Sequence, residues 1–120
     1  MSDPGALTVA RAYHRAWSTQ DLDGIGRYLA EDLHVEVPIN SYSGKRDFLE
    51  AVRRTAQMTS SVKLLAEFGS GKEALLLYDM TLPIGELRVA EHFTIADGQI
   101  HRVRQIHDTA ALRAAGFGRE

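Results

Sequence analysis

Leu87-Arg88-Val89-Ala90-Glu91-His92-Phe93-Thr94-Ile95 is the most informative stretch of the chain. Side chains alternate between the two faces of a strand, so Glu91 should share a face with the apolar groups Leu87, Val89, Phe93 and Ile95. A carboxylate in apolar surroundings takes up a proton, pairs with a cation or accepts hydrogen bonds. We therefore predict a pocket with Glu91 on its floor. The alternatives are a bulge in the strand register and an internal ion pair without function.

The same period of two extends through the second half of the chain. Alternating runs occupy residues 62–68, 74–82, 86–96 and 99–107. The turns between them are short and rich in glycine, as at Asp97-Gly98, which predicts hairpins and an antiparallel meander. One further half-buried strand is expected at residues 33–37, where Pro38 should end it.

Helical periodicity dominates the first half of the chain. Asp3-Pro4 predicts an N-cap and a first helical position, and the buried face that follows is Ala6, Ala10, Tyr13 and Trp17. A second, short helix should begin at Asp21. A last helical turn is expected at residues 108–115.

A third helix is predicted from a buried stripe made of Phe48, Leu49, Val52 and Ala56. The charged residues opposite this stripe should form a solvated face: Arg46, Glu50, Arg53 and Arg54. Helices in the first half and an antiparallel sheet in the second half predict an α+β fold.

Length and composition narrow the class of protein. A chain of 120 residues predicts one domain, residues 1–120. Cysteine is absent, which excludes disulfides and thiolate sites. The net charge of -2 argues against a nucleic-acid partner, and no apolar run approaches membrane length, so we expect a cytoplasmic protein that binds no membrane.

The candidate motifs for phosphate and metal binding are incomplete in this sequence. Gly69-Ser70-Gly71-Lys72 lacks the spacing of a phosphate loop and fits a hairpin turn. The chain has 5 histidines, but no helical pair with an acid between them. We expect neither a metal nor a cofactor.

Three segments resemble one known group of proteins. Tyr13 followed by Asp21-Leu22-Asp23-Gly24-Ile25, then Val35-Glu36-Val37-Pro38, then Glu91-His92-Phe93 resemble the nuclear transport factor 2-like superfamily, in its SnoaL-like and ketosteroid isomerase-like branch. The resemblance implies a cone-shaped fold with N-terminal helices packed on a curved antiparallel sheet. The superfamily contains isomerases, polyketide cyclases, dehydratases, epoxide hydrolases and members without known activity, so the fold does not assign a reaction.

The same resemblance implies roles for particular residues. Tyr13 matches the tyrosine that donates a hydrogen bond to the oxyanion in ketosteroid isomerases, and Glu91 matches their neutral carboxylic acid. Val37 stands where those enzymes keep their general base, and it cannot accept a proton. Steroid isomerisation by that mechanism is therefore not expected here.

The last strand offers a substitute base. His101, Val103, Gln105 and His107 share one side-chain parity, and the resemblance favours this parity as the inner one. A pair of Glu91 and His107 would then supply an acid and a base near neutral pH. The alternative is a histidine that is merely satisfied by a buried acid.

The remaining candidates would line an apolar pocket. They are Trp17, Val37, Tyr78, Met80, Phe93, Val103 and Gln105. Aromatic and methionine side chains at such spacings also occur as plain core, and Tyr13 could bury its ring for packing alone.

Three functions remain open. The first is a pocket for a small apolar, oxygen-bearing molecule, in which Tyr13, Glu91 and His107 catalyse isomerisation, cyclisation, dehydration or epoxide opening. The second is binding of such a molecule without turnover. The third is a homodimeric interaction module that uses the outer sheet face, made of Leu75, Leu77, Asp79, His92 and Arg104.

Overall fold

The computed structural model describes residues 5–116, which fold into helices packed on one curved sheet. The elements in chain order are α1 (Ala6–Ser18), α2 (Leu22–Ile25), the single-turn helix η1 (Gly26–Tyr28), β1 (Leu29–Glu36), β2 (Ser41–Ser43), α3 (Lys45–Met58), β3 (Ser61–Ser70), β4 (Glu73–Leu82), β5 (Gly85–Ala96), β6 (Gln99–Ile106) and α4 (Ala110–Ala114). The predicted α+β class is confirmed. No helix in this part of the chain is long and apolar enough to cross a membrane.

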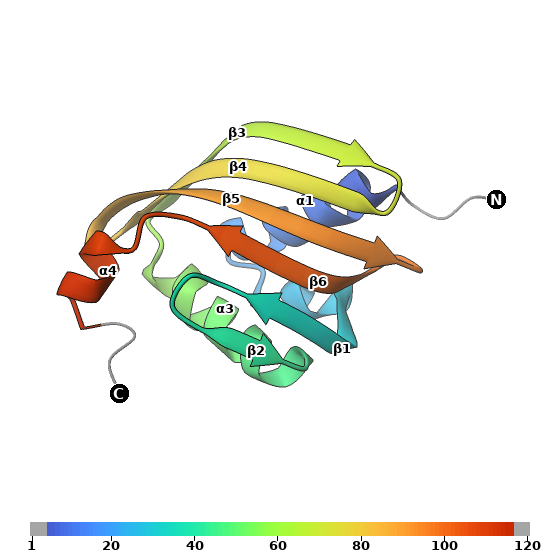
Figure 1. The fold of residues 1–120 in the computed structure, drawn as a ribbon, viewed down its shortest axis with the longest axis horizontal. Helices are drawn as coiled ribbons and strands as arrows, with labels where there is room; N and C mark the ends of the chain where they lie inside the picture. Colours follow the sequence, from blue (N-terminus) through green and yellow to red (C-terminus); the bar gives the residue numbers. More distant parts are fainter. Residues whose placement is uncertain (1–4, 117–120) are drawn as a thin grey trace.

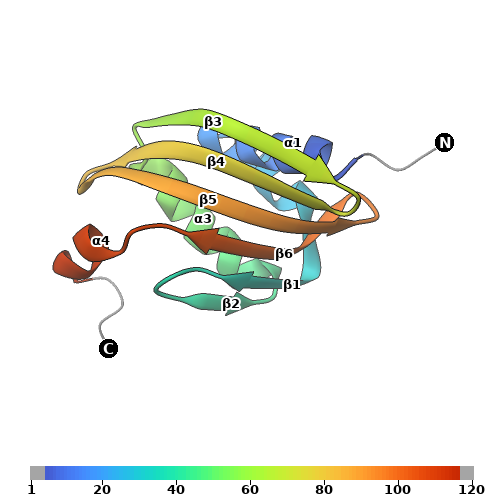
Figure 2. The same cartoon turned by 45° about the horizontal axis from the view of Figure 1, so that its top comes forward.

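The sheet is six-stranded, in the order β2-β1-β6-β5-β4-β3. The strands from β3 to β6 form the predicted hairpin meander and arch over α1 and α3 (Figures 1 and 2). The expectation of a wholly antiparallel sheet is wrong at one place, since β1 pairs with β6 in parallel. Parallel neighbours need a long connection, and here β2, α3 and β3 to β5 lie between β1 and β6 in the chain.

Turn chemistry accounts for the tight hairpins. Asp97 and Gly98 join β5 to β6 with φ of 54° and 73°, the two positive values that a two-residue turn between twisted strands requires. Gly85 reaches φ 127° directly after the turn between β4 and β5. Each of these glycines adopts a conformation that a side chain would strain.

The helices cover the inner face of the sheet with their apolar stripes. α1 packs on β3, β4 and β5, and α3 packs on β1. α1 is followed by the predicted short helix, where Asp21 caps α2 by accepting a hydrogen bond from the Gly24 amide at 3.1 Å. The predicted cap at Asp3-Pro4 lies outside the described residues, and Gly5 occupies the N-cap position of α1.

One close approach fixes α1 against the outer part of the sheet. A Cβ built on Gly69 of β3 would lie 2.7 Å from the Cβ of Leu7. Real Cβ atoms do not come so close, so a side chain at Gly69 would push the helix away from the strand. Glycine is therefore required here by packing.

A contiguous core joins the helices to the sheet, and Leu76 is its central residue on β4, with no exposed surface. Leu76→Ala should lower the free energy of unfolding by about 2–5 kcal/mol, because it removes buried methyl groups and leaves a cavity. Urea unfolding at equilibrium measures this change. Leu65→Ala is the matched control, since Leu65 is 37% exposed at the bulge of β3 and its truncation should lower that free energy by less than about 1 kcal/mol. Equal losses in the two variants would contradict the described core.

Candidate functional site

A cavity of about 1050 Å³ lies between the inner face of the sheet and helices α1 and α3. Its size suits a drug-sized ligand, for which pockets run from about 300 to 1,000 Å³. Most of the residues predicted for the site lie on its wall: Tyr13, Trp17, Val37, Tyr78, Met80, Glu91, Gln105 and His107. The side chains between them are largely apolar, so the cavity favours an apolar ligand.

Two residues predicted as ligand contacts lie elsewhere. Phe93 and Val103 face each other across β5 and β6, and neither has any exposed surface. They belong to the core behind the cavity and not to its wall, because α1 covers the sheet at that level. Phe93 supports the site indirectly, since its ring meets the ring of Tyr13 edge to face at 5.8 Å.

Glu91 is the buried acid at the inner end of the cavity, and only 1% of its surface is exposed. One carboxylate oxygen, Oε1, accepts a hydrogen bond from the Tyr78 hydroxyl at 3.0 Å. The other, Oε2, accepts one from Nε2 of Gln105 at 2.8 Å. Gln105 lies directly opposite Glu91 in the register of β5 and β6, and Tyr78 lies on the diagonal across β4. The sheet geometry therefore delivers both donors.

Burial dominates the ionisation of this acid. It raises the pKa of Glu91 from 4.5 to about 7, although the hydrogen bonds from Gln105 and Tyr78 act in the opposite direction. Comparable amounts of the neutral and charged forms are therefore present near neutral pH. Such a group can donate a proton or accept one.

Two tyrosines near Glu91 remain protonated. Burial, and then the negative charge of Glu91, raise the pKa of Tyr13 and of Tyr78 well above 10. Tyr78 already donates to Glu91, whereas Tyr13 is not one of the two donors to that carboxylate. The Tyr13 hydroxyl on the cavity wall is therefore a neutral donor suited to a ligand oxygen.

The predicted pair of Glu91 and His107 is not formed within residues 5–116. Both oxygens of Glu91 are taken by Tyr78 and Gln105, and Nδ1 of His107 lies 2.9 Å from the Asp108 carbonyl oxygen. A carbonyl can only accept, so Nδ1 carries the proton and donates. The neutral ring then keeps its lone pair on Nε2, which is available as an acceptor or base.

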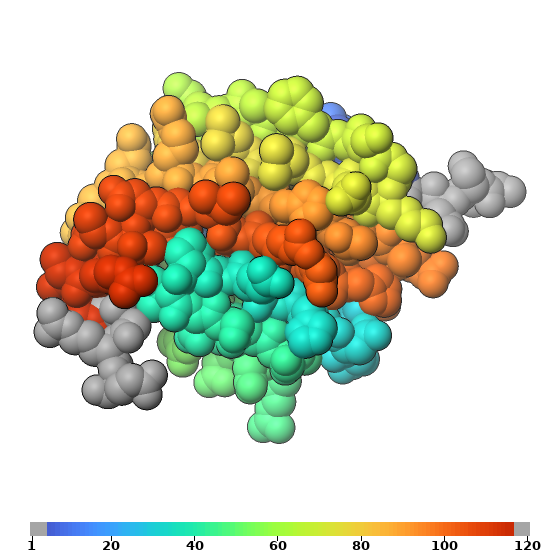
Figure 3. All heavy atoms as spheres, in the orientation of Figure 1, coloured from blue at the N-terminus to red at the C-terminus, as the bar shows by residue number. Residues whose placement is uncertain are grey.

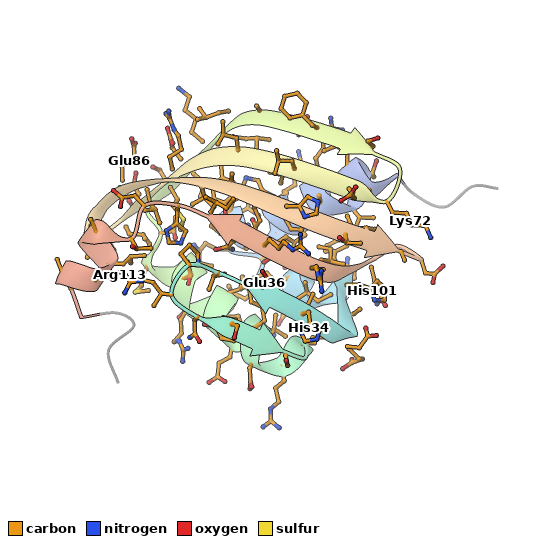
Figure 4. The ribbon with its side chains drawn as sticks, in the orientation of Figure 1. His34, Glu36, Lys72, Glu86, His101 and Arg113 are labelled. Carbon is orange, nitrogen blue, oxygen red and sulfur yellow. The ribbon has the colours of Figure 1, made fainter. Side chains whose placement is uncertain are left out.

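The last strand does not keep one parity along its length. Val103, Gln105 and His107 face inward as predicted, but Ile100 is buried and His101 lies at the outer surface (Figure 4). The register shift beside Thr94 and Ile95 changes the alternation at this point. The prediction that His101 shares the inner face is therefore wrong, and its ring instead contacts Asp32 at 3.2 Å.

Two residues of interest escaped the sequence prediction. His14 is 6% exposed, packs against Trp17 and Tyr78 at centroid distances of 5.3 and 4.8 Å, and its Nδ1 has no hydrogen-bond partner in the described part of the chain. Burial lowers its pKa to about 4. The helical spacing could have indicated that His14 is buried, because it lies between Ala10 and Trp17 on the apolar stripe of α1. Arg54, expected on the solvated face of α3, lines the cavity.

No group of three or more histidine or acidic side chains that could hold a metal occurs among residues 5–116. Three polar side chains of β1 and β6 point away from the helices, on the outer face of the sheet: His34, Glu36 and His101 (Figure 4).

The raised pKa of Glu91 predicts a dependence of stability on pH. Between pH 4.5 and about 7, Glu91 binds more protons in the folded state than in the unfolded state. The free energy of unfolding of the parent, measured relative to that of Glu91→Gln, should therefore be highest below pH 4.5 and should decline as the pH rises. The total decline should be roughly 3 kcal/mol. Urea unfolding of both proteins over this range measures it.

The comparison with Glu91→Gln is necessary because His14 acts in the opposite direction. Because the pKa of His14 is lowered, its imidazole binds more protons in the unfolded state between about pH 4 and 6.5, and the His14 contribution to stability therefore rises with pH in both proteins. Glu86→Gln, at an exposed position on β5, is the control and should show no difference from the parent. Parallel pH profiles for Glu91→Gln and the parent would contradict the raised pKa.

Comparisons with known proteins agree with this architecture. The SnoaL-like domain matches residues 10–103. A protein of known crystal structure from Kribbella flavida DSM 17836 is 32% identical, with 92% of this chain and 93% of that chain covered and a TM-score of 0.87. No curated protein matches the sequence.

Two more distant structures share the fold. A nuclear transport factor 2-like protein of unknown function from Cytophaga hutchinsonii ATCC 33406 is 14% identical, with 94% and 99% of the two chains covered and a TM-score of 0.82. A protein provisionally named a ketosteroid isomerase, from Kribbella flavida DSM 17836, is 22% identical, with 88% and 78% covered and a TM-score of 0.74. At such identities both bear on the fold alone. The match to the SnoaL-like domain spans most of the chain, and the chain belongs to the SnoaL-like family of the nuclear transport factor 2-like fold.

Proposed function

We propose that the protein binds a small apolar molecule through an oxygen atom and converts it by acid-base chemistry. The observation that supports this proposal most strongly is Glu91, a buried acid with a pKa of about 7 on the wall of an apolar cavity. A general acid or base works best when its pKa lies near the working pH. A purely structural acid would need no cavity beside it.

Each polar group in the cavity has a role in this proposal. Tyr13 donates a hydrogen bond to the ligand oxygen, and the neutral form of Glu91 donates a second one or a proton. Tyr78 and Gln105 orient the Glu91 carboxyl group and stabilise its charged form. His107 accepts a proton through Nε2, because its Nδ1 donates to the Asp108 carbonyl.

The reaction class follows from the groups that are present and from the one that is replaced. Val37 lines the cavity at the position where the resemblance to ketosteroid isomerases would place a carboxylate base. We therefore assign proton abstraction to His107 and proton donation to the neutral form of Glu91. Isomerisation, cyclisation, dehydration and epoxide opening all fit an acid and a base that require no cofactor.

A ligand screen tests the proposal. Apolar ketones, lactones, epoxides and phenols should raise the thermal midpoint, since a ligand at 100 times its dissociation constant stabilises a fold by about 2.7 kcal/mol. Glu91→Gln and Tyr13→Phe should each weaken the binding of a hit, because each removes a donor or acid from the cavity. Glu86→Gln, an exposed carboxylate on β5, is the control.

Turnover of the hit then separates catalysis from binding. His107→Gln should abolish product formation while binding persists, because it removes the proposed base. Product formation by the parent protein but not by His107→Gln would support an enzymatic function. Binding without product for any hit would favour a ligand-binding protein, and the absence of any hit would contradict the pocket function.

A homodimer is proposed from the outer face of the sheet. Two rows cross this face: Phe68, Leu75, His92 and Arg104 form one, and Ala66, Leu77, Ala90 and Ile106 form the other. Phe68 is 64% exposed and Ile106 is 73% exposed, and Figure 3 views the molecule from this side. Asp79 and His92 are already paired with Arg88 and Glu73, so the apolar side chains are what the face offers to a second copy.

Light scattering at micromolar concentration tests the dimer. The parent protein should give twice the chain mass of 13.3 kDa, and Phe68→Glu should give the single mass because it places a charge in the apolar contact. Arg46→Glu on α3 serves as the control and should remain dimeric. A parent protein of single mass would contradict the proposed dimer.

Residence in the cytoplasm, and the absence of nucleic acid and membrane partners, remain predictions from composition.

A further inference from the structure

Charged side chains are distributed unevenly along the cavity. Among the lining residues of the described chain, Glu91 is the only acid and Arg54 the only lysine or arginine. Glu91 is buried at the inner end, whereas the Arg54 side chain is 67% exposed. A lining residue that is so exposed lies at the rim. The cavity therefore has a titrating acid inside and a permanent positive charge at its opening.

Arg54 is only weakly neutralised by its neighbours. Its ion pair with Glu50, one helical turn away, has an N–O distance of 4.0 Å, and both side chains are largely exposed. Exposed pairs of this kind in helices contribute little, because water screens both charges. Glu50 does not line the cavity, so a ligand at the rim meets the guanidinium rather than the carboxylate.

The backbone near Arg54 does not oppose a negative charge strongly. Helix C-termini expose carbonyl groups that repel anions, but two of those in the last turn of α3, from Thr55 and Ala56, accept hydrogen bonds. Thr59 donates its hydroxyl to the Thr55 carbonyl at 2.7 Å and its amide to the Ala56 carbonyl at 3.3 Å. The Gln20 side chain also donates to the Ala56 carbonyl.

The inner end has the opposite preference. Glu91 is partly ionised near neutral pH, and a second negative charge beside it would be repelled. A neutral oxygen, such as a ketone or hydroxyl, suits the Tyr13 and Glu91 donors better. Polarity at both ends and apolar walls between them define the orientation of a ligand.

Building on the proposed function, we infer that the ligand is an amphipathic acid: a neutral oxygen faces Glu91, an apolar body fills the cavity, and a carboxylate or similar anion contacts Arg54 at the rim. This assigns Arg54 as a specificity-determining residue. The acid-base chemistry alone would not require a charged ligand, whereas contact with Arg54 requires a negative charge on it.

Two matched probes test the inference, namely naphthoylpropanoate and naphthoylpropanamide, which share an aryl ketone and differ only in the charge of the tail. Calorimetric titration at about pH 6.5 keeps the free carboxylate ionised. The parent protein should bind the carboxylate about fivefold more tightly than the amide, as expected for a partly exposed ion pair. This preference should shrink as salt is added.

Variants on α3 identify the responsible charge. Arg54→Gln should reduce the carboxylate preference to about one, whereas Arg53→Gln, the neighbouring arginine that does not line the cavity, should leave it unchanged. Equal affinity for the two probes in the parent protein would overturn the inference. So would equal losses in both variants, or no binding of either probe.

Glu91→Gln separates this inference from the function on which it is built. It should weaken both probes by the same factor, because both present the same ketone to the inner end. If Glu91→Gln changes neither affinity while Arg54→Gln still removes the preference, the rim assignment stands and the acid-base proposal fails. If Glu91→Gln weakens both probes and the parent shows no preference, the reverse holds.

Discussion

The burial of the Glu91 carboxyl group is the constraint to which the site is fitted. An acid with 1% exposure on a strand would be strongly destabilising without hydrogen bonds, and the sheet supplies two donors from the neighbouring strands. Gln105 and Tyr78 can do so only if β4, β5 and β6 keep their register, so the hairpin turns matter for the site as well as for the fold. The same burial raises the pKa of Glu91 to about 7, and the carboxyl group lies on the wall of the cavity.

Local chemistry was sufficient to predict the meander and the helices. Asp97-Gly98 encodes its hairpin through two positive φ angles, and the alternation around Glu91 defines the inner face of β5. The parallel pairing of β1 with β6 depends on contacts between distant segments, which no local pattern records. The same holds for the bulge beside Thr94 that turns His101 outward, because an extra residue in a strand leaves no distinctive residue type.

Strand parity and the family resemblance predicted which residues lie at the site, but not which of them form hydrogen bonds with one another. Together they placed Tyr13, Glu91, Gln105 and His107 on the cavity wall, but parity cannot say which of two neighbouring groups forms a hydrogen bond. Tyr78 and Gln105 took both oxygens of Glu91, which left His107 to the backbone. Arg54 could not be predicted for a similar reason: the sequence pattern places a charged residue on the solvated face of a helix whether or not that face borders a cavity.

Membership of the SnoaL-like family describes the scaffold better than it describes a reaction. The cavity retains the tyrosine and the buried acid that the resemblance to ketosteroid isomerases implies, and it has a valine at the position of the base. The pKa of Glu91, about 7, allows it to exchange a proton near neutral pH, and the neutral His107 ring carries its lone pair on Nε2.

Titration of the Glu91 carboxyl group measures the pKa on which the proposed acid-base chemistry depends. Carbon-detected NMR of glutamate-labelled protein, with the Glu91→Gln variant to assign the resonance, follows its protonation in the folded state. We expect a midpoint of about 7, because burial raises the pKa of Glu91. A midpoint near the ordinary value of 4.5 would contradict it, because Glu91 would then be fully charged at neutral pH and unable to act as an acid.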